Sequence, residues 1–206
     1  MELTAIEPRR HRLVQLFLDG EPAVKLDAVT AQEERLRVGM ELDDEQLHAL
    51  LQKSDAARAK EKALYLLEHR PHAKRELERK LSRTVSEDAA RAAADRMEEL
   101  GLVDDEDYAC RLAQELARKG YAAPRAAQEL ARRGVDRDLA RSAAQEAVSD
   151  PGEALRALIA RKYARRLGDE KGRRQTVAAL QRLGYRWDEI RSALREFDAL
   201  PEADAD

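Results

Sequence analysis

The side chains most able to do chemistry in this chain are basic, and they gather in one segment. Between residues 161 and 186 the sequence has nine Lys or Arg against two acidic residues, a local charge of +7 in a chain whose net charge is −3. Arg161 and Arg165 are four residues apart, as are Lys162 and Arg166, so each pair shares a face if the segment forms one helix. Such a stripe suits phosphates or acidic side chains. The alternative interpretation is an ordinary solvated helix face.

Other candidate chemistry is weak. His69 and His72 form a His-x-x-His pair, but Pro71 lies inside it and no Cys or carboxylate cluster stands at ligand spacing, so no metal site is predicted. Cys110 lies in an Ala/Leu-rich pattern and is predicted to be a small buried side chain. The acidic run at 104–107 is expected at a helix start, where carboxylates are favourable without an ion.

The sequence therefore predicts no enzyme. It has no glycine-rich phosphate loop, no serine in a nucleophile turn and no acidic pair in an apolar setting. We predict no catalytic residue, no metal and no cofactor.

Composition points to helices with narrow buried stripes. Charged residues make up 38% of the 206 residues, hydrophobic residues 43% and aromatic residues 4%. The apolar content is too high for a disordered chain, and the scarcity of aromatic residues argues against base stacking as a binding mechanism. No apolar run is long enough to span a membrane and residues 1–12 do not resemble a secretory signal, so we expect a cytoplasmic protein.

The first fifty residues differ from the rest. Apolar residues at 13–18 and 23–26 flank Asp19-Gly20, the pattern of a β-hairpin, and residues 4–6 are a candidate third strand. Thr30 with Glu33 has the form of a capping box that opens a helix, and Gly39 is a candidate stop.

From residue 53 onward the sequence repeats. Leu81, Leu130 and Leu180 stand 49 and 50 residues apart, a regular period typical of stacked helical modules. Three further columns agree: Asp88, Asp138 and Asp188; Arg91, Arg141 and Arg191; Ala93, Ala143 and Ala193. We interpret each Asp and Arg as a local pair in the first turns of a helix, and each Ala as room for close packing.

The fold class predicted is mainly α, with three tandem three-helix repeats in an extended curved array after a small N-terminal β-hairpin and helix segment. The predicted divisions are residues 1–52 for that segment, 53–103, 104–149 and 150–198 for the repeats, and 199–206 for an acidic flexible tail.

Each repeat also carries one arginine near the end of its second helix, at Arg83, Arg132 and Arg182. Our preferred interpretation is that these side chains interact with the last carbonyls of the helix. The alternative is a ladder of cations along one surface. A further basic group lies between Arg70 and Arg83 and includes Lys74 and Arg75.

Several motifs together resemble the RecX family, which regulates the RecA recombinase. The resemblance covers nearly the whole chain and is carried by Ala63–Leu67, Arg70, Glu76–Leu81, Leu100–Ala109, Glu129–Val135, Leu183–Tyr185 and Asp188–Ile190. The chain departs from the family pattern at His72 and Ala73, where a small polar cap and a basic residue are common, and in the first repeat, which has Arg83-Thr84 instead of a glycine.

The resemblance implies a non-catalytic protein that binds RecA and the RecA filament on single-stranded DNA, and restrains recombination and coprotease activity. We expect a monomer with no membrane association and with direct DNA contact as a further option. The alternative function is a helical nucleic-acid-binding protein that acts without RecA. The residues predicted to bind RecA or nucleic acid are Arg161, Lys162, Arg165, Arg166, Arg173, Arg174, Arg182, Arg132, Arg133, Arg125, Lys74 and Arg75.

Overall fold

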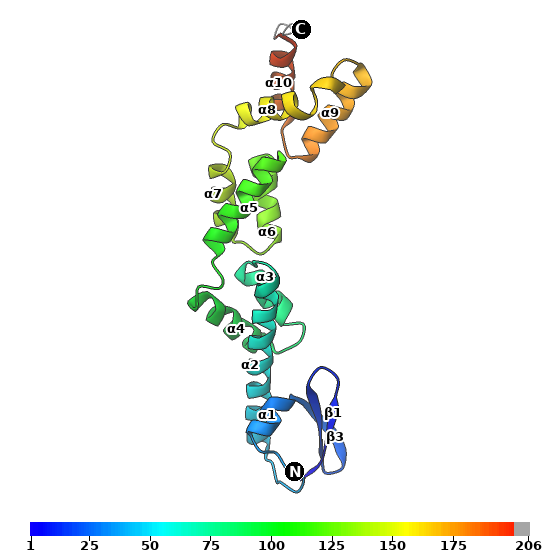
Figure 1. Cartoon of the computed structure of the whole chain (residues 1–206), viewed down its shortest axis with the longest axis vertical. Coiled ribbons are helices and arrows are strands. Elements are labelled where there is room, and N and C mark those ends of the chain that lie inside the picture. Colours follow the sequence, from blue (N-terminus) through cyan, green and yellow to red (C-terminus); the bar gives the residue numbers. More distant parts are fainter. Residues whose placement is uncertain (200–206) are drawn as a thin grey trace. The chain divides into compact units, whose positions relative to one another are not determined.

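The computed structural model describes residues 1–199 and is mainly helical, with a small antiparallel sheet at the N-terminus (Figure 1). The predicted fold class, a mainly α chain after a short β segment, is confirmed. Residues 200–206 of the predicted tail lie outside the described range. Among the described residues, no helix has the length and apolar character needed to cross a membrane.

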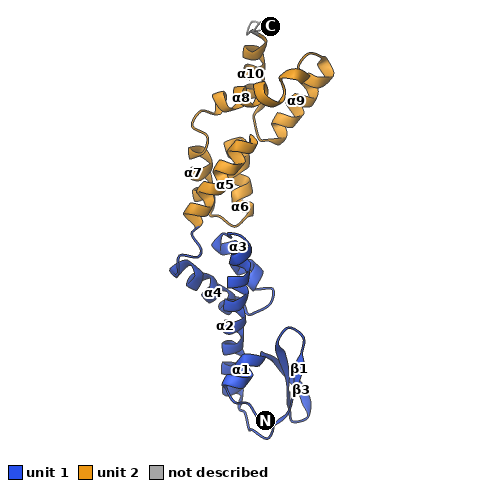
Figure 2. Cartoon of the chain, viewed as in Figure 1, with its two compact units in different colours: residues 1–104 blue, residues 105–206 orange. Residues whose placement is uncertain are grey.

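Two compact units divide the chain at residues 104 and 105 (Figure 2). The first contains the sheet and helices α1 to α4, and the second contains helices α5 to α10. The predicted division into one segment and three repeats is finer than this and stays a prediction.

The sheet has the order β1-β2-β3, with strands β1 (Leu3–Arg9), β2 (Leu13–Leu18) and β3 (Glu21–Asp27). Asp19 and Gly20 form the predicted turn, and both have positive φ, as a two-residue turn between right-twisted strands favours. The candidate third strand lies within β1. The sheet buries Leu3, Leu16 and Leu26 completely.

Helix α1 (Ala28–Glu33) begins earlier than the sequence predicted. Its N-cap is Asp27, whose carboxylate accepts hydrogen bonds from the backbone N–H groups of Val29 at 2.9 Å and Thr30 at 3.2 Å. The predicted capping box at Thr30 and Glu33 is therefore wrong. Asp27 ends β3 and reaches the free N–H groups first, which leaves Thr30 buried inside the helix.

Helix α2 (Asp44–His69) serves two cores. Its first half carries Leu50 into a cluster with the sheet residues, and its second half carries Ala59 and Ala63 into a cluster with α3 (Lys74–Leu81) and α4 (Glu87–Glu99). The predicted boundary between residues 52 and 53 thus falls inside one continuous helix. The N-terminal segment and the first three-helix repeat share this helix, which couples the two cores mechanically.

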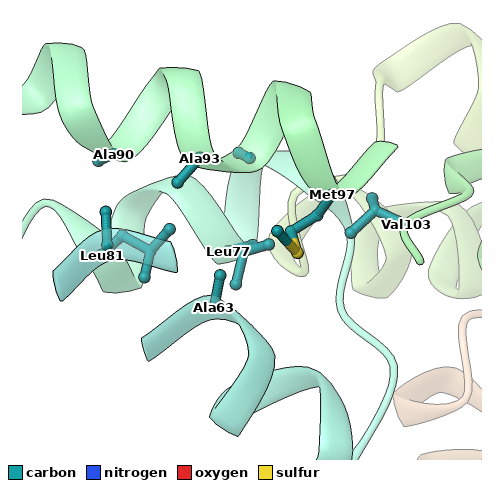
Figure 3. Packing of buried hydrophobic residues seen from close by; sticks show 9 residues of the cluster. Ala63, Leu77, Leu81, Ala90, Ala93, Met97 and Val103 are labelled. Atoms are coloured by element: carbon teal, nitrogen blue, oxygen red, sulfur yellow. The ribbon is translucent and has the colours of Figure 1, made fainter. Parts of the chain in front are cut away.

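Small side chains allow the three helices of this second core to approach closely. Ala90, Ala93 and Met97 of α4 face Leu77 and Leu81 of α3 across the core in Figure 3. Alanine at these positions leaves space that the leucines fill, which is how a core with few aromatic residues reaches high density.

The second unit contains seven helical segments within its described residues. Their bounds are α5 (Asp105–Lys119), α6 (Ala123–Arg132), α7 (Arg137–Glu146), α8 (Pro151–Lys162), the 3₁₀ helix η1 (Ala164–Arg166), α9 (Glu170–Arg182) and α10 (Trp187–Ala199). Leu155, Ile159, Leu180 and Ile190 form the centre of the core of its last four segments.

Cys110 is exposed, so the prediction of a buried cysteine is wrong. The buried stripe of α5 follows Ala109, Leu112, Ala113 and Leu116. Cys110 comes one residue after Ala109, about 100° further around the helix, and so lies beside the stripe.

A largely buried polar cluster joins the end of α2 to α3. Arg70 binds the Glu76 carboxylate with two hydrogen bonds, at 3.1 and 2.6 Å, and the Lys80 ammonium lies 3.4 Å from the same carboxylate. His72 Nδ1 donates to the Arg70 carbonyl at 2.8 Å, because Nε2 must accept from Lys80 at 2.8 Å. The N-cap of α3 is Ala73, which supplies no side-chain hydrogen bond.

Burial and the neighbouring cations Arg70 and Lys80 lower the pKa of His72, despite its hydrogen bond to the Arg70 carbonyl. Burial alone would raise the pKa of Glu76, but the hydrogen bonds and charge of Arg70 outweigh it and lower that pKa. The cluster is therefore built for a neutral imidazole and an ionised carboxylate.

We predict that the first unit loses stability as the pH falls below about 6.5, the ordinary pKa of histidine. In that range the unfolded chain binds a proton at His72 that the folded chain resists, so acid favours unfolding. Urea unfolding at pH 7.5 and pH 5.5 measures the effect. Glutamine stays neutral at both pH values, so the H72Q variant should lose less stability between pH 7.5 and pH 5.5 than the wild-type protein. If both proteins lose the same stability, His72 is not the cause.

Candidate binding interface

The predicted basic stripe does not lie on one helix. Helix α8 ends at Lys162, and Tyr163 leaves the helical conformation with φ −121° before η1 begins at Ala164. Leu167, which follows η1, is buried in the core of the second unit. The expectation that Arg161 and Arg165 share a helix face, as well as Lys162 and Arg166, is therefore wrong.

Arg161 and Lys162 lie at the C-terminal end of α5. The Arg161 guanidinium donates to the carbonyl of Arg118, and the Lys162 ammonium donates to the carbonyl of Lys119, each at 3.4 Å. Cations are favourable here because the last carbonyls of a helix carry partial negative charge. Both side chains remain exposed, so they hold this end of α5 weakly and keep donors available to a partner.

The turn that follows α5 brings the end of α9 close. The backbone N–H of Ala122 donates to the carbonyl of Leu183 at 2.9 Å. Gly184, with φ +96°, lies so near Arg125 that a Cβ added to the glycine would overlap the Cβ of the arginine. In Figure 1 the end of α9 meets the turn between α5 and α6. Residues sixty positions apart in the sequence thus become neighbours.

These contacts gather exposed cations around one place, which we term the junction cluster. Its members stand within three residues of the contacts just described. The junction cluster consists of Arg118, Lys119, Arg125, Arg161, Lys162, Arg182 and Arg186.

Most members of the junction cluster make no ion pair with a carboxylate among the described residues. Lys119 pairs with Glu115 at 2.5 Å, which lowers the pKa of that carboxyl group, and Arg186 lies 3.4 Å from Asp188. Arg125 meets the neutral amide of Gln128. Within residues 1–199, five members make no ion pair: Arg118, Arg125, Arg161, Lys162 and Arg182.

Arg118, Lys119 and Arg186 were not among the residues predicted to bind. Arg118 and Lys119 fill the last turn of α5, where basic residues are common, so the sequence gives no reason to single them out. Only the packing of α8 and α9 against the end of α5 places them beside the predicted residues.

The other predicted residues of the second unit take no part in the contacts that define this cluster. Arg165 and Arg166 are exposed and make no ion pair among the described residues; Arg165 follows Lys162 by three residues, and both arginines precede α9. Arg174 pairs with Glu170 one turn earlier on α9. These cations lie between the end of α8 and the first two turns of α9.

Arg173 has a structural role in the same region. Its guanidinium binds Asp198 of α10 with two hydrogen bonds, at 2.9 and 2.7 Å, and donates from Nε to the carbonyl of Leu167 at 2.9 Å. The contact with Asp198 raises the pKa of Arg173 and lowers that of Asp198. Arg173 therefore ties α9 to α10.

Arg132 and Arg133 stand at the far end of α6 from Arg125. Arg132 donates to the Glu129 carboxylate at 2.5 Å. We predicted an interaction with the last carbonyls of the helix, so its partner here is a side chain instead of the backbone. Lys74 belongs to the first unit and contacts Asp95 at 2.7 Å and Glu98 at 2.6 Å, which raise its pKa. Arg75, next to Lys74, is exposed.

Two aromatic side chains are exposed, although aromatic residues are scarce in this chain. Trp187 is 55% exposed at the first residue of α10, and Tyr65 is 52% exposed on α2. The sequence contains few aromatic residues, and their exposure could not be read from their number. Trp187 follows Arg186 directly and so belongs to the surroundings of the junction cluster.

Metal chemistry finds no support in the described part of the chain. No group of three or more His, Cys, Asp or Glu residues is placed to hold an ion within residues 1–199. Of the His-x-x-His pair, His72 is buried and uses both ring nitrogens in the polar cluster.

Comparison with known proteins identifies similar sequences and folds. A family model described as RecX, second three-helix domain, matches residues 104–143, which span α5, α6 and part of α7. The protein named Regulatory protein RecX of Xanthomonas axonopodis pv. citri is 34% identical over 137 residues, which cover 66% of this chain and 85% of that protein. The corresponding protein of Stenotrophomonas maltophilia is 33% identical over 137 residues, 66% of this chain and 84% of that protein.

Solved structures share the fold at lower identity. A crystal structure of a regulatory protein RecX superposes with a TM-score of 0.56 at 18% identity and covers 94% of this chain and 98% of that one. RecX from Lactobacillus salivarius gives a TM-score of 0.60 at 21% identity and covers 71% of this chain and 98% of its own.

We predict that G184A destabilises the second unit by about 2–4 kcal/mol, because it adds both a clash with Arg125 and a side chain at positive φ. G101A is the matched control. Gly101 also has positive φ (+69°), but nothing lies within 4 Å of its added Cβ, so only about 1 kcal/mol should be lost. Urea unfolding measures both, and equal losses would show that the close approach at Gly184 contributes nothing.

Proposed function

This chain belongs to the RecX family of regulatory proteins, and from that membership we propose that it regulates the RecA recombinase. In this proposal the protein binds the RecA filament on single-stranded DNA and restrains recombination and coprotease activity. It acts by binding, without catalysing a reaction and without a cofactor. We further propose that it works as a monomer in the cytoplasm, through three three-helix repeats.

The observation that carries the proposal is the junction cluster. Five exposed cations without an ion pair among the described residues meet there from helices α5, α6, α8 and α9. A DNA strand coated by a protein offers phosphates and acidic side chains, and both attract such a cluster. The net charge of the chain is −3, so the rest of the chain repels polyanions. A polyanion is therefore directed to the local positive surface.

The location of the junction cluster suits regulation. It spans the second and third proposed repeats, and its cations come from segments that hold those repeats together. A partner that binds there contacts both repeats at once. Binding would therefore also stabilise their mutual arrangement.

The second candidate function is nucleic-acid binding that does not need RecA. The exposure of Trp187 beside cations favours it, since aromatic and basic side chains together bind single strands. This second function predicts tight binding to a naked single strand, with an affinity that falls steeply as the salt concentration rises.

We predict that the protein slows DNA-dependent ATP hydrolysis by its cognate RecA when present at less than one copy per RecA monomer. The reason is that, in this proposal, each copy binds the assembled filament and restrains more than one RecA monomer. The steady-state rate of ATP hydrolysis on circular single-stranded DNA measures this. Added salt should weaken the effect, because the junction cluster binds through charge.

The control is the same assay with DNA in large excess over both proteins. If the chain merely competes for naked DNA, excess DNA abolishes the inhibition and the second candidate function is the better one. An unchanged rate at one copy per RecA monomer would contradict the proposed function outright.

A further inference from the structure

The packing of the protein does not require an aromatic side chain at the position of Trp187. It is the first residue of α10, and the first residues of α4 and α7, the equivalent helices of the other two repeats, are Glu87 and Arg137. Both are polar and exposed. The three-helix repeat thus folds with a charged residue at this position, so the scaffold gives no reason for tryptophan in the third copy.

Exposure of this side chain is unfavourable in the free protein. Trp187 is 55% exposed, which leaves much of a large indole in water. Burial of this ring against a partner would be worth several times the energy of an ordinary surface contact. Two residues earlier, Tyr185 is buried in the core. The backbone N–H of Arg186 also donates to the Glu189 carboxylate at 2.7 Å, so the indole is held out from an ordered helix start.

Several cations lie near this position in the chain. Arg182 and Arg186 lie within five residues of Trp187, and Arg125 packs against Gly184, three residues before it. The two nearby carboxylates are engaged, since Asp188 pairs with Arg186 and Glu189 caps the helix. Within the described residues Arg125 and Arg182 make no ion pair, so their charge is available to a ligand.

We propose that Trp187 stacks on a base of single-stranded nucleic acid, while Arg125, Arg182 and Arg186 contact the phosphates on either side. An exposed ring flanked by cations matches both parts of such a strand, the flat base and the charged backbone. A duplex fits poorly because its bases are already stacked on one another.

This inference rests on the proposed function, since the RecA filament would supply the strand, but its test uses DNA without RecA. Trp187 is the single tryptophan of the chain, so indole fluorescence reports this side chain alone. We expect titration with an oligothymidylate to quench the fluorescence and to reach saturation. No quenching by oligothymidylate would overturn the proposal.

Substitution separates stacking from attraction by charge. W187A should weaken binding of a labelled oligothymidylate by about 5- to 100-fold, the range for loss of one stacked base, whereas W187F should recover part of the affinity. Neither should change the unfolding midpoint, because the indole is not part of the core. Y65A removes the other half-exposed aromatic side chain and is the matched control that should leave the affinity unchanged.

Two results would overturn the assignment. Equal affinities of the wild-type protein and W187A for the oligonucleotide would show that charge alone binds the strand. A fluorescence change produced by RecA without DNA, and none by DNA, would instead place Trp187 in a protein contact. Inhibition of RecA ATP hydrolysis could persist in either case, so failure here is distinguishable from failure of the proposed function.

Discussion

The hydrogen bond from the Ala122 N–H to the Leu183 carbonyl requires two chain segments to approach within backbone distance. Gly184 makes that approach possible, because any larger residue would overlap Arg125 and would be strained at φ +96°. Gly120 has a related role, since an added Cβ would stand 2.8 Å from Leu158. The two glycines thus allow the turn after α5 to pack against the last helices, where Ala122 joins the core formed by residues of α8, α9 and α10.

In the proposed function, the approach of these two chain segments also brings the cations of the junction cluster together. Arginine and lysine side chains repel one another when gathered, and a fold tolerates this only where the charges stay exposed or gain partners. At the junction cluster, the carbonyls of Arg118 and Lys119 in α5 accept hydrogen bonds from Arg161 and Lys162, Lys119 and Arg186 pair with carboxylates, and the other cations are exposed. The repulsion that remains is relieved when an anionic partner binds. In the proposed function, the cluster would therefore join the packing of the scaffold to the binding of an anionic partner.

The sequence predicted what depends on local chemistry and missed what depends on packing at a distance. The Asp19-Gly20 turn follows from residue type, as does the mainly helical fold, and the Asp88–Arg91 and Asp138–Arg141 pairs form as expected, at 3.7 and 3.3 Å. In the third copy Asp188 pairs with Arg186 instead. The break after Lys162 that ends α8, and the approach of the turn after α5 to the end of α9, are not revealed by spacing. Four of the seven basic residues of the junction cluster were predicted, and Arg118, Lys119 and Arg186 were not.

Binding to RecA filaments tests most directly whether the junction cluster is the interface. Two double variants provide a matched comparison, because each removes two exposed arginines that make no ion pair within the described residues: R125A with R182A in the cluster, and R165A with R166A at the start of α9. Alanine keeps the Cβ of residue 125 that packs on Gly184. Cosedimentation with RecA filaments on single-stranded DNA should show a loss of affinity of several-fold or more for the first variant and little change for the second. Equal affinity of both variants, or a greater loss for the second, would contradict the account.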